Sequence, residues 1–205
     1  MKLPPQAFAR PDASSDLDFY AQPRLVTHID EAAIGAVTQL YREMLPSGGT
    51  ILDLMSSWVS HLPPEVPYKS IVGLGMNAVE LKANGRLNTW MVHDLNADPT
   101  MPFEDQEFDA VTCCVSVQYL TRPAEAWREV ARACKPGAPA IITFSNRCFP
   151  TKAVLAWQMT DDEGHGALVS QYLQEAEGWQ DIQLLNRSPA PGRGDPLFAV
   201  VAMRQ

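Results

Sequence analysis

The chain has 205 residues and a formal net charge of -8, with 16 Lys and Arg residues against 24 Asp and Glu residues. This length fits a single α/β domain, because a chain of this size buries roughly 70% of its unfolded surface on folding. The acidic balance and the lack of a basic stripe argue against a nucleic-acid partner, since phosphate binding relies on clustered Lys and Arg.

The four cysteines, Cys113, Cys114, Cys134 and Cys148, have no spacing typical of a zinc site. Reduced thiols are typical of a cytoplasmic protein. The N-terminal stretch has no apolar run long enough for a signal peptide, and no segment approaches the ~20 apolar residues of a membrane-spanning helix. We therefore expect a cytoplasmic protein with no metal centre and no membrane partner.

Residues 1–29 are expected to form an N-terminal arm or cap, and residues 30–205 a single domain. Residues 1–19 carry three prolines, which favours a loosely ordered arm or a short lid element over a core strand. A helix should follow, with Asp30 as its N-cap and apolar residues at helical spacing from Ile34 to Leu45. Pro46 stops this helix.

Five short apolar runs predict the strands of a parallel sheet, because segments long enough for crossover connections separate them. The runs are residues 50–54, 70–76, 89–95, 111–117 and 140–146. Helices are expected after Pro123 and over about residues 162–177. The tail predicts an antiparallel hairpin, with strands at 179–189 and 195–204 joined by a Pro/Gly-rich turn. The expected fold is α/β, with helices on both faces of seven strands.

The stretch from Phe103 to Asn146 is the most informative part of the chain. Its Phe108-Asp109 opening and its Lys135-Pro136-Gly137 exit resemble the C-terminal half of a class I S-adenosylmethionine-dependent methyltransferase domain. The resemblance spans roughly residues 50–204. It implies a Rossmann-like seven-stranded sheet, S-adenosylmethionine as cofactor and methyl transfer to a small molecule. A nicotinamide-dependent dehydrogenase fits less well, because no Gly-x-Gly-x-x-Gly follows the first strand.

Ligands of open α/β sheets sit beyond the carboxyl ends of the strands, so the first strand's end is the first place to inspect. The family usually has an acid there, followed by a glycine-rich loop. This chain keeps the acid, Asp53, but has Met55, Ser56 and Ser57 in the loop, where positive φ is costly. The two serines could donate hydrogen bonds to the cofactor. They could equally cap a strand-to-helix turn.

The second strand ends at Gly75, where the family has an acid that holds the ribose hydroxyls. A carboxylate in that role contributes on the order of 1.5 to 3 kcal/mol, so its loss should cost affinity unless another group replaces it. Asn77 is the nearest candidate, and Glu80 has a longer reach. Asn77 as a helix N-cap is an equally open reading.

The ends of the third and fourth strands match the family better. Asp94 and Leu95 are similar to the acid that receives the adenine amino group and its apolar neighbour, although Asp94 could simply cap a turn. Ser116 follows the fourth strand, where the family has further cofactor contacts. The residues that the resemblance assigns to the cofactor are Asp53, Met55, Ser56, Ser57, Gly75, Asn77, Asp94, Leu95 and Ser116. Cys113 and Cys114 should point to opposite faces of their strand as core residues.

Methyl transfer needs in-line alignment and exclusion of water, and it needs a general base only if the acceptor must lose a proton. His28, His93 and Tyr20 are the candidate catalytic residues, although a lone histidine is more often structural. Aromatic neighbours would favour the sulfonium, and Trp58, Tyr20 and Tyr119 are the candidates. The substrate-binding candidates are Tyr20, Tyr119, Asn146 and Arg147.

Arg147 and Lys152 should sit at the mouth of the cleft and would suit an anionic substrate, unless they are solvated surface charges. Two hypotheses on function follow. The chain is a small-molecule methyltransferase with an altered cofactor loop, or it is a methyltransferase-like binding or scaffold protein that has lost catalysis. Gly75 and Met55 are what the second hypothesis predicts.

Overall fold

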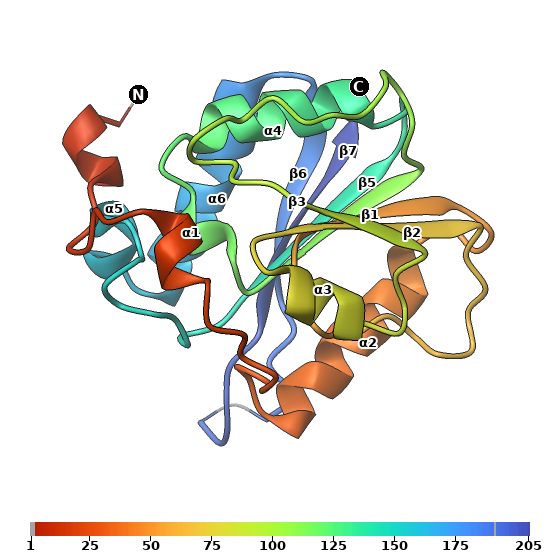
Figure 1. Cartoon of the computed structure of the whole chain (residues 1–205). Coiled ribbons are helices and arrows are strands. Elements are labelled where there is room, and N and C mark those ends of the chain that lie inside the picture. Colours follow the sequence, from red (N-terminus) through yellow and green to blue (C-terminus); the bar gives the residue numbers. More distant parts are fainter. Residues whose placement is uncertain (1–2, 191) are drawn as a thin grey trace.

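The computed structural model describes residues 3–190 and 192–205, and across these residues one sheet of seven strands runs through the molecule (Figure 1). The strands are β1 (Thr50–Ser56), β2 (Ser70–Gly75), β3 (Thr89–Val92), β4 (Ala110–Cys114), β5 (Pro139–Phe144), β6 (Trp179–Asn186) and β7 (Phe198–Arg204). Their order is β3-β2-β1-β4-β5-β7-β6, and β7 is antiparallel to β5 and to β6. The expected sheet and its C-terminal hairpin are confirmed. Pro191, in the expected hairpin turn, lies outside the described residues.

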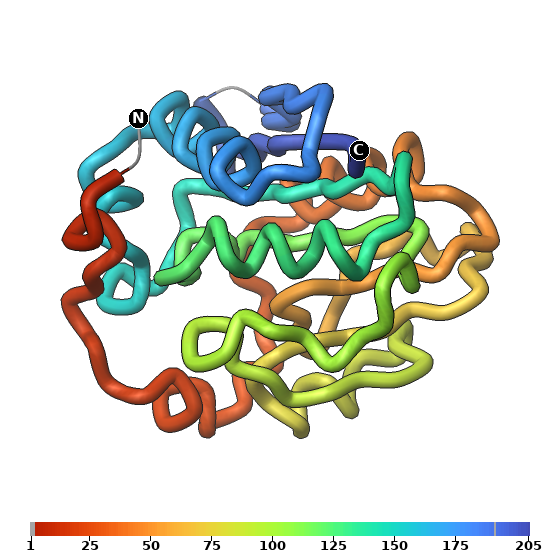
Figure 2. Tube along the Cα trace, turned by 90° about the horizontal axis from the view of Figure 1, so that it is seen from above, coloured from red at the N-terminus to blue at the C-terminus, as the bar shows by residue number. Residues whose placement is uncertain are grey.

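Three long helices cover the two faces of the sheet (Figures 1 and 2). They are α2 (Glu31–Met44), α4 (Pro123–Ala133) and α6 (Asp162–Ala176). Asp30 caps α2 as expected, because its side chain accepts a hydrogen bond from the Ala33 amide. Helix α2 packs against one face, and α4 and α6 pack against the other. All three helices were expected from their apolar spacing.

The sheet separates two apolar cores, which explains the near-continuous apolar runs in its parallel strands. Leu52 and Cys113 belong to the core under α4 and α6, whereas Ile51 belongs to the core under α2. Cys114 packs against the second core, so the two neighbouring cysteines point to opposite faces as expected. All four cysteines are free thiols.

Shorter helical elements complete the description. They are η1 (Pro5–Phe8), α1 (Asp16–Phe19), α3 (Ala78–Ala83), η2 (Val117–Tyr119) and α5 (Leu155–Gln158). The helix start expected at Asn77 as an open reading is present as α3, whereas α5 was not predicted, because it is too short to show an apolar period. No helix in the described part of the chain has the length and the apolar surface needed to span a bilayer.

The connection between β1 and β2 contains no helix, although parallel strands are usually joined through one. Pro63, Pro64 and Pro67 interrupt this segment, and His61 adopts a positive φ of 53°. The reading of Ser56 and Ser57 as caps of a helix after the first strand is therefore wrong. The backbone amides of a helix N-terminus are not offered at this point of the sheet edge.

The N-terminal arm, residues 3–29, runs along the carboxyl ends of the strands and is anchored at several points (Figure 2). The Asp12 amide donates to the Thr151 carbonyl at 2.9 Å, and the Leu155 amide donates to the Ala9 carbonyl at 2.9 Å. The described part of the arm contains two short helical elements, η1 and α1, and no strand. Residues 1–2 of the expected arm lie outside the described residues.

Candidate functional site

A cavity of about 280 Å³ lies at the carboxyl ends of β1 to β4, and the arm forms one of its walls. This is the edge of the sheet where strand order reverses between β1 and β4. The structure brings most of the residues singled out in the sequence to the wall of this cavity: Tyr20, His28, Met55, Ser56, Ser57, Gly75, His93, Asp94, Leu95, Ser116, Tyr119 and Arg147. Asp53, Asn77 and Asn146 are not part of the wall.

Asp53 is buried beneath the loop that follows β1, where hydroxyl groups surround its carboxylate. Ser56 and Ser60 each donate to Oδ2 at 2.6 Å, and Thr112 donates to Oδ1 at 3.2 Å. Burial raises the pKa of Asp53 to about 6, although these hydrogen bonds oppose the shift. Asp53 therefore fixes Ser56 and Ser60 by hydrogen bonds and does not line the cavity.

The end of β1 lacks the glycines of the family, and Met55 adopts the left-handed backbone conformation that a glycine would adopt at lower cost. This residue adopts a left-handed φ of 55° within a bulge of the β1–β2 ladder, and Ser56 then pairs with Gly75. The bulge brings the Ser56 carbonyl so close to Gly75 that a Cβ atom there would lie 2.1 Å from the oxygen. The two differences from the family pattern, Met55 and Gly75, are thus linked, because the bulge at Met55 leaves room only for a glycine at position 75.

Asn77 is confirmed as the N-cap of α3, because its Oδ1 accepts from the Val79 amide at 2.9 Å and the Glu80 amide at 3.1 Å. Its Nδ2 donates to the carbonyls of Tyr20 at 2.8 Å and Ala21 at 3.1 Å. Asn77 therefore holds the arm against the start of α3 from outside the cavity.

Glu80, in the first turn of α3, carries the carboxylate that lies beside Gly75 in the cavity wall. It is buried, and its two oxygens accept from the Arg24 amide and from the Ser57 hydroxyl, each at 2.6 Å. The sequence analysis placed Glu80 second to Asn77 as a replacement for the missing acid. In the structure Glu80 lines the cavity and Asn77 does not.

Asp94 lines the cavity and also caps the turn after β3. Its Oδ1 accepts from the Asn96 amide at 2.9 Å and from the Ala97 amide at 3.2 Å. Asn96 continues the wall, and its Nδ2 donates to Asp16 at 2.8 Å and to the Tyr119 carbonyl at 3.0 Å. The two readings of Asp94, turn cap and cavity residue, are therefore compatible.

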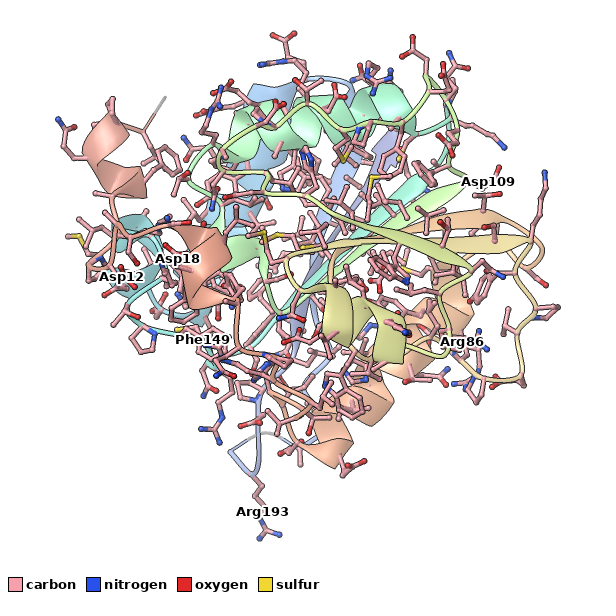
Figure 3. The ribbon with its side chains drawn as sticks, in the orientation of Figure 1. Asp12, Asp18, Arg86, Asp109, Phe149 and Arg193 are labelled. Carbon is pink, nitrogen blue, oxygen red and sulfur yellow. The ribbon has the colours of Figure 1, made fainter. Side chains whose placement is uncertain are left out.

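A cluster of aromatic rings lines the cavity between the arm and the loop after β5, and Phe149 is its centre (Phe149 is labelled in Figure 3). The Phe149 ring stacks on Tyr119 at 5.9 Å between centroids and meets the edges of His28 at 5.2 Å and Tyr20 at 6.5 Å. The Phe149 amide donates to the Tyr119 hydroxyl at 2.8 Å. The sequence analysis did not include Phe149 among its site candidates, although it follows the candidates Asn146 and Arg147 closely in the chain.

The two candidate histidines have different surroundings. Burial lowers the pKa of His28, which favours a neutral imidazole at neutral pH. His93 Nε2 lies 2.8 Å from the Asp98 carbonyl, so this nitrogen carries its hydrogen and donates it there. Trp58 is absent from the cavity wall, and its indole donates to the Val26 carbonyl at 3.0 Å.

Asn146 and Arg147 lie at a separate open recess on the surface, together with Asp30 and Asp195. The Arg147 Nε donates to Asp195 at 2.7 Å, so this cation already has an acidic partner. Asn146 is exposed there and does not line the cavity, whereas Arg147 lines both the recess and the cavity.

Lys152 is fully buried, which overturns its expected place at the mouth of the cleft. Its Nζ lies 3.2 Å from Asp16 and 3.3 Å from Asp12, and it donates to the Ser14 carbonyl at 2.8 Å. Arg10 pairs with Asp16 from the other side at 2.8 Å. This group of charges, which we call the arm latch, fastens residues 10–16 to the domain. No group of metal-binding side chains occurs among the described residues.

Residues 57–142 match the family model of a methyltransferase domain. No curated protein matches the chain in sequence. Among solved structures, the cyclase SpnF is similar with a TM-score of 0.60 and 16% identity, over 82% of this chain and 80% of that one. An S-adenosylmethionine-dependent methyltransferase from Mesorhizobium loti is similar with a TM-score of 0.56 and 15% identity, over 82% and 98% of the two chains.

Phosphoethanolamine N-methyltransferase 2 of Haemonchus contortus, in complex with S-adenosylmethionine, is similar with a TM-score of 0.57 and 14% identity. The match covers 83% of this chain and 52% of that one, so this chain spans about half the length of the Haemonchus protein. At these identities the solved structures show a shared fold.

Proposed function

The matched domain and the shared fold confirm the resemblance to class I S-adenosylmethionine-dependent methyltransferases, and from this premise we propose that the cavity binds S-adenosylmethionine. The observation that supports this most strongly is the pair of acidic residues in the wall. Asp94 follows β3 and Glu80 lies beside the end of β2, at the edge of the sheet where nucleotides bind in such folds.

The adenine end of the proposed site is the turn after β3. Asp94 uses Oδ1 for the turn and has no donor to Oδ2 among the described residues, so Oδ2 can accept the exocyclic amino group of an adenine. Leu95 is buried next to it and offers an apolar surface to the ring. The residues present therefore fit an adenine.

The ribose end of the proposed site is Glu80. A carboxylate has about four lone-pair positions, and Glu80 uses two of them for the Arg24 amide and the Ser57 hydroxyl. The remaining positions can accept the two ribose hydroxyls. Glu80 thus replaces an acid at position 75, where the Ser56 carbonyl leaves no room for a side chain.

When bound, S-adenosylmethionine supplies an activated methyl group on a sulfonium. The residues of the chain would then have to hold the acceptor in line and keep water out. Tyr20, Tyr119 and Phe149 form an apolar aromatic wall suited to both tasks, since aromatic faces attract a cationic centre. Where the acceptor must lose a proton, neutral His28 is the residue we propose as its base.

The second candidate function is a methyltransferase-like binding protein without catalysis. Three observations favour it: Asp53 is turned away from the cavity, no helix follows β1, and Met55 stands in the loop beside the proposed site. The cyclase SpnF shares the fold, and fold alone does not determine the reaction. Three expectations stay predictions from the sequence: that the methyl acceptor is a small molecule, that the protein is cytoplasmic and that it has no nucleic-acid partner.

Calorimetric titration with S-adenosylhomocysteine tests the proposal. A micromolar dissociation constant for S-adenosylhomocysteine supports a cofactor site, as the enzyme requires. Binding weaker than ~1 mM supports the second candidate. Methyl transfer from S-adenosylmethionine to a panel of small molecules with hydroxyl, amine or carboxylate acceptors then separates a bound cofactor from a used one. Micromolar binding with no transfer to any acceptor would support the second candidate.

A further inference from the structure

Arg24 places a guanidinium in the cavity wall, and no acidic side chain in the described part of the chain pairs with it. Its Nη1 donates to the Gln22 carbonyl at 3.4 Å and its Nη2 to the Phe19 carbonyl at 3.1 Å, both in the backbone of the arm. A guanidinium carries five N–H groups, so these two bonds leave three donors for a ligand.

The other cations near the cavity have acidic partners. Arg147 pairs with Asp195 at 2.7 Å, and Lys152 lies within 3.3 Å of both Asp12 and Asp16. Over residues 3–190 and 192–205, Arg24 forms no ion pair with a carboxylate. A cation in a partly enclosed wall attracts an anionic ligand more strongly than a solvated surface charge does.

Aromatic rings hold the Arg24 guanidinium in place. Its central carbon lies 4.7 Å from the ring centroid of Phe19, 5.3 Å from that of Phe149 and 5.8 Å from that of Tyr20. Cation–π contacts of this kind orient the planar group without using its hydrogen-bond donors. The guanidinium is thus fixed in position while its N–H groups stay available.

The acidic residues of the wall do not compete for this guanidinium. Glu80 contacts the backbone amide of Arg24 and the Ser57 hydroxyl, and Asp16 is paired within the arm latch. Asp94 accepts hydrogen bonds from the turn after β3. A carboxylate that entered the cavity would therefore find Arg24 as a charged donor already set in place.

We propose that Arg24 binds the carboxylate of a ligand in this cavity, an inference that rests on the proposed function of the site. Two sources have this chemistry: the amino-acid end of S-adenosylmethionine, and a carboxylate on the methyl acceptor. The loop after β1 offers no helix N-terminus to an anion, which leaves this task to the arm.

The experiment compares ligands that differ only in the charged group. S-Adenosylhomocysteine has the carboxylate, and 5′-methylthioadenosine is the matching nucleoside without it. Benzoate and benzamide, titrated in the presence of saturating 5′-methylthioadenosine, form the same kind of pair for the acceptor. Arg24→Gln removes the cation and keeps the backbone amide that donates a hydrogen bond to Glu80. Arg193→Gln is the control of equal charge, because Arg193 is exposed on the distant loop between β6 and β7 (Figure 3).

If the carboxylate belongs to the cofactor, Arg24→Gln weakens S-adenosylhomocysteine binding at least about tenfold and changes methylthioadenosine binding less than about twofold. If it belongs to the acceptor, the same contrast appears between benzoate and benzamide. The affinity of Arg24→Lys for the charged ligands should lie between that of the unmodified protein and that of Arg24→Gln, since lysine keeps the charge and loses the fork geometry of the guanidinium. Arg193→Gln should leave all four ligands unchanged.

The inference would be overturned if Arg24→Gln changed the affinities for the charged and the neutral ligand by the same factor in both pairs. Unchanged thermal unfolding midpoints show that the variants are folded. Methylthioadenosine binding by the unmodified protein reports on the proposed nucleoside site by itself. Its absence would reject the proposed function, while selective loss of benzoate binding, measured without nucleoside, would still support Arg24 as the carboxylate-binding residue.

Discussion

The carbonyl oxygen of Ser56 occupies the space that a side chain on residue 75 would need. A Cβ atom on Gly75 would lie 2.1 Å from this oxygen and 3.0 Å from a methyl carbon of Leu81. The bulge at Met55 creates this contact, since it lets β1 continue to Ser56 and pair there with β2. An acid at position 75 is therefore excluded by the backbone of the neighbouring loop.

Gly75→Ala should lower the free energy of unfolding by about 3 kcal/mol, because overpacking against a backbone carbonyl cannot be relieved by a side-chain rotation. Urea unfolding measures this change. Gly85→Ala is the matched control: a Cβ atom there meets nothing within 4 Å, so the change should stay within about 0.5 kcal/mol. Equal stability of the two variants would show that the loop after β1 moves aside easily.

The sheet could be predicted from the sequence because each strand carries its own signal. The β5 strand, for example, is mostly apolar and is buried along its whole length, as expected for a strand covered on both faces, and Asp30 and Pro123 mark helix starts by local chemistry. The sequence analysis also located the sheet edge where the cavity lies, since parallel strands end there together.

The details of the site could not be predicted, because they depend on contacts between distant segments. Lys152 looked like a surface cation until the fold brought Asp16 to within 3.2 Å of it. Arg24 and Glu80 are 56 positions apart and meet only when the arm crosses α3. A bulge such as that at Met55 has no sequence signal, because methionine rarely adopts positive φ.

Asp94→Asn should weaken S-adenosylhomocysteine binding about tenfold or more while the fold stays intact. The amide keeps one oxygen for the Asn96 and Ala97 amides, but it presents N–H donors where an adenine amino group also donates. Titration calorimetry measures the affinity, and thermal unfolding checks the turn. Unchanged affinity in a folded variant would place the adenine elsewhere in the cavity.

Glu80→Gln should remove the preference of the site for ribose hydroxyls. We expect the unmodified protein to bind adenosine about tenfold more tightly than 2′,3′-dideoxyadenosine, because a carboxylate accepting hydroxyl groups forms charge-assisted hydrogen bonds. In Glu80→Gln this ratio should fall towards one. The comparison of two ligands on one variant cancels any general loosening of α3. A ratio that survives the substitution would assign the ribose to another residue.

Lys152→Met should release the arm, because it leaves the carboxylates of Asp16 and Asp12 without their buried ammonium partner. Removing one member of a buried ion pair costs about 3 kcal/mol or more. Chymotrypsin should then cleave faster near Phe8 and Phe19, while the rest of the domain stays resistant. Lys135→Met is the control, because its pair with Asp109 is exposed and should contribute less than about 1 kcal/mol. Equal cleavage of both variants would show that the arm latch does not hold the arm.

Asp53→Asn should change how stability depends on pH. Burial raises the pKa of Asp53 from an ordinary value near 3.8 to about 6, so only at pH values well below 3.8 is the carboxyl protonated in both the folded and the unfolded states. Between about pH 4 and pH 6 the unfolded chain loses this proton first, and folding stability therefore falls as the pH rises. Above that window the cost of burying the charge persists.

The asparagine variant cannot ionise and can still accept hydrogen bonds from Ser56 and Ser60. Its free energy of unfolding, relative to that of the unmodified protein, should be about 2.5 kcal/mol higher at pH 7.5 than at pH 4. Urea unfolding at the two pH values measures this difference. Parallel stability curves for the two proteins would mean that the Asp53 carboxylate is compensated in full by its hydroxyl partners, and that the loop after β1 stores no electrostatic cost.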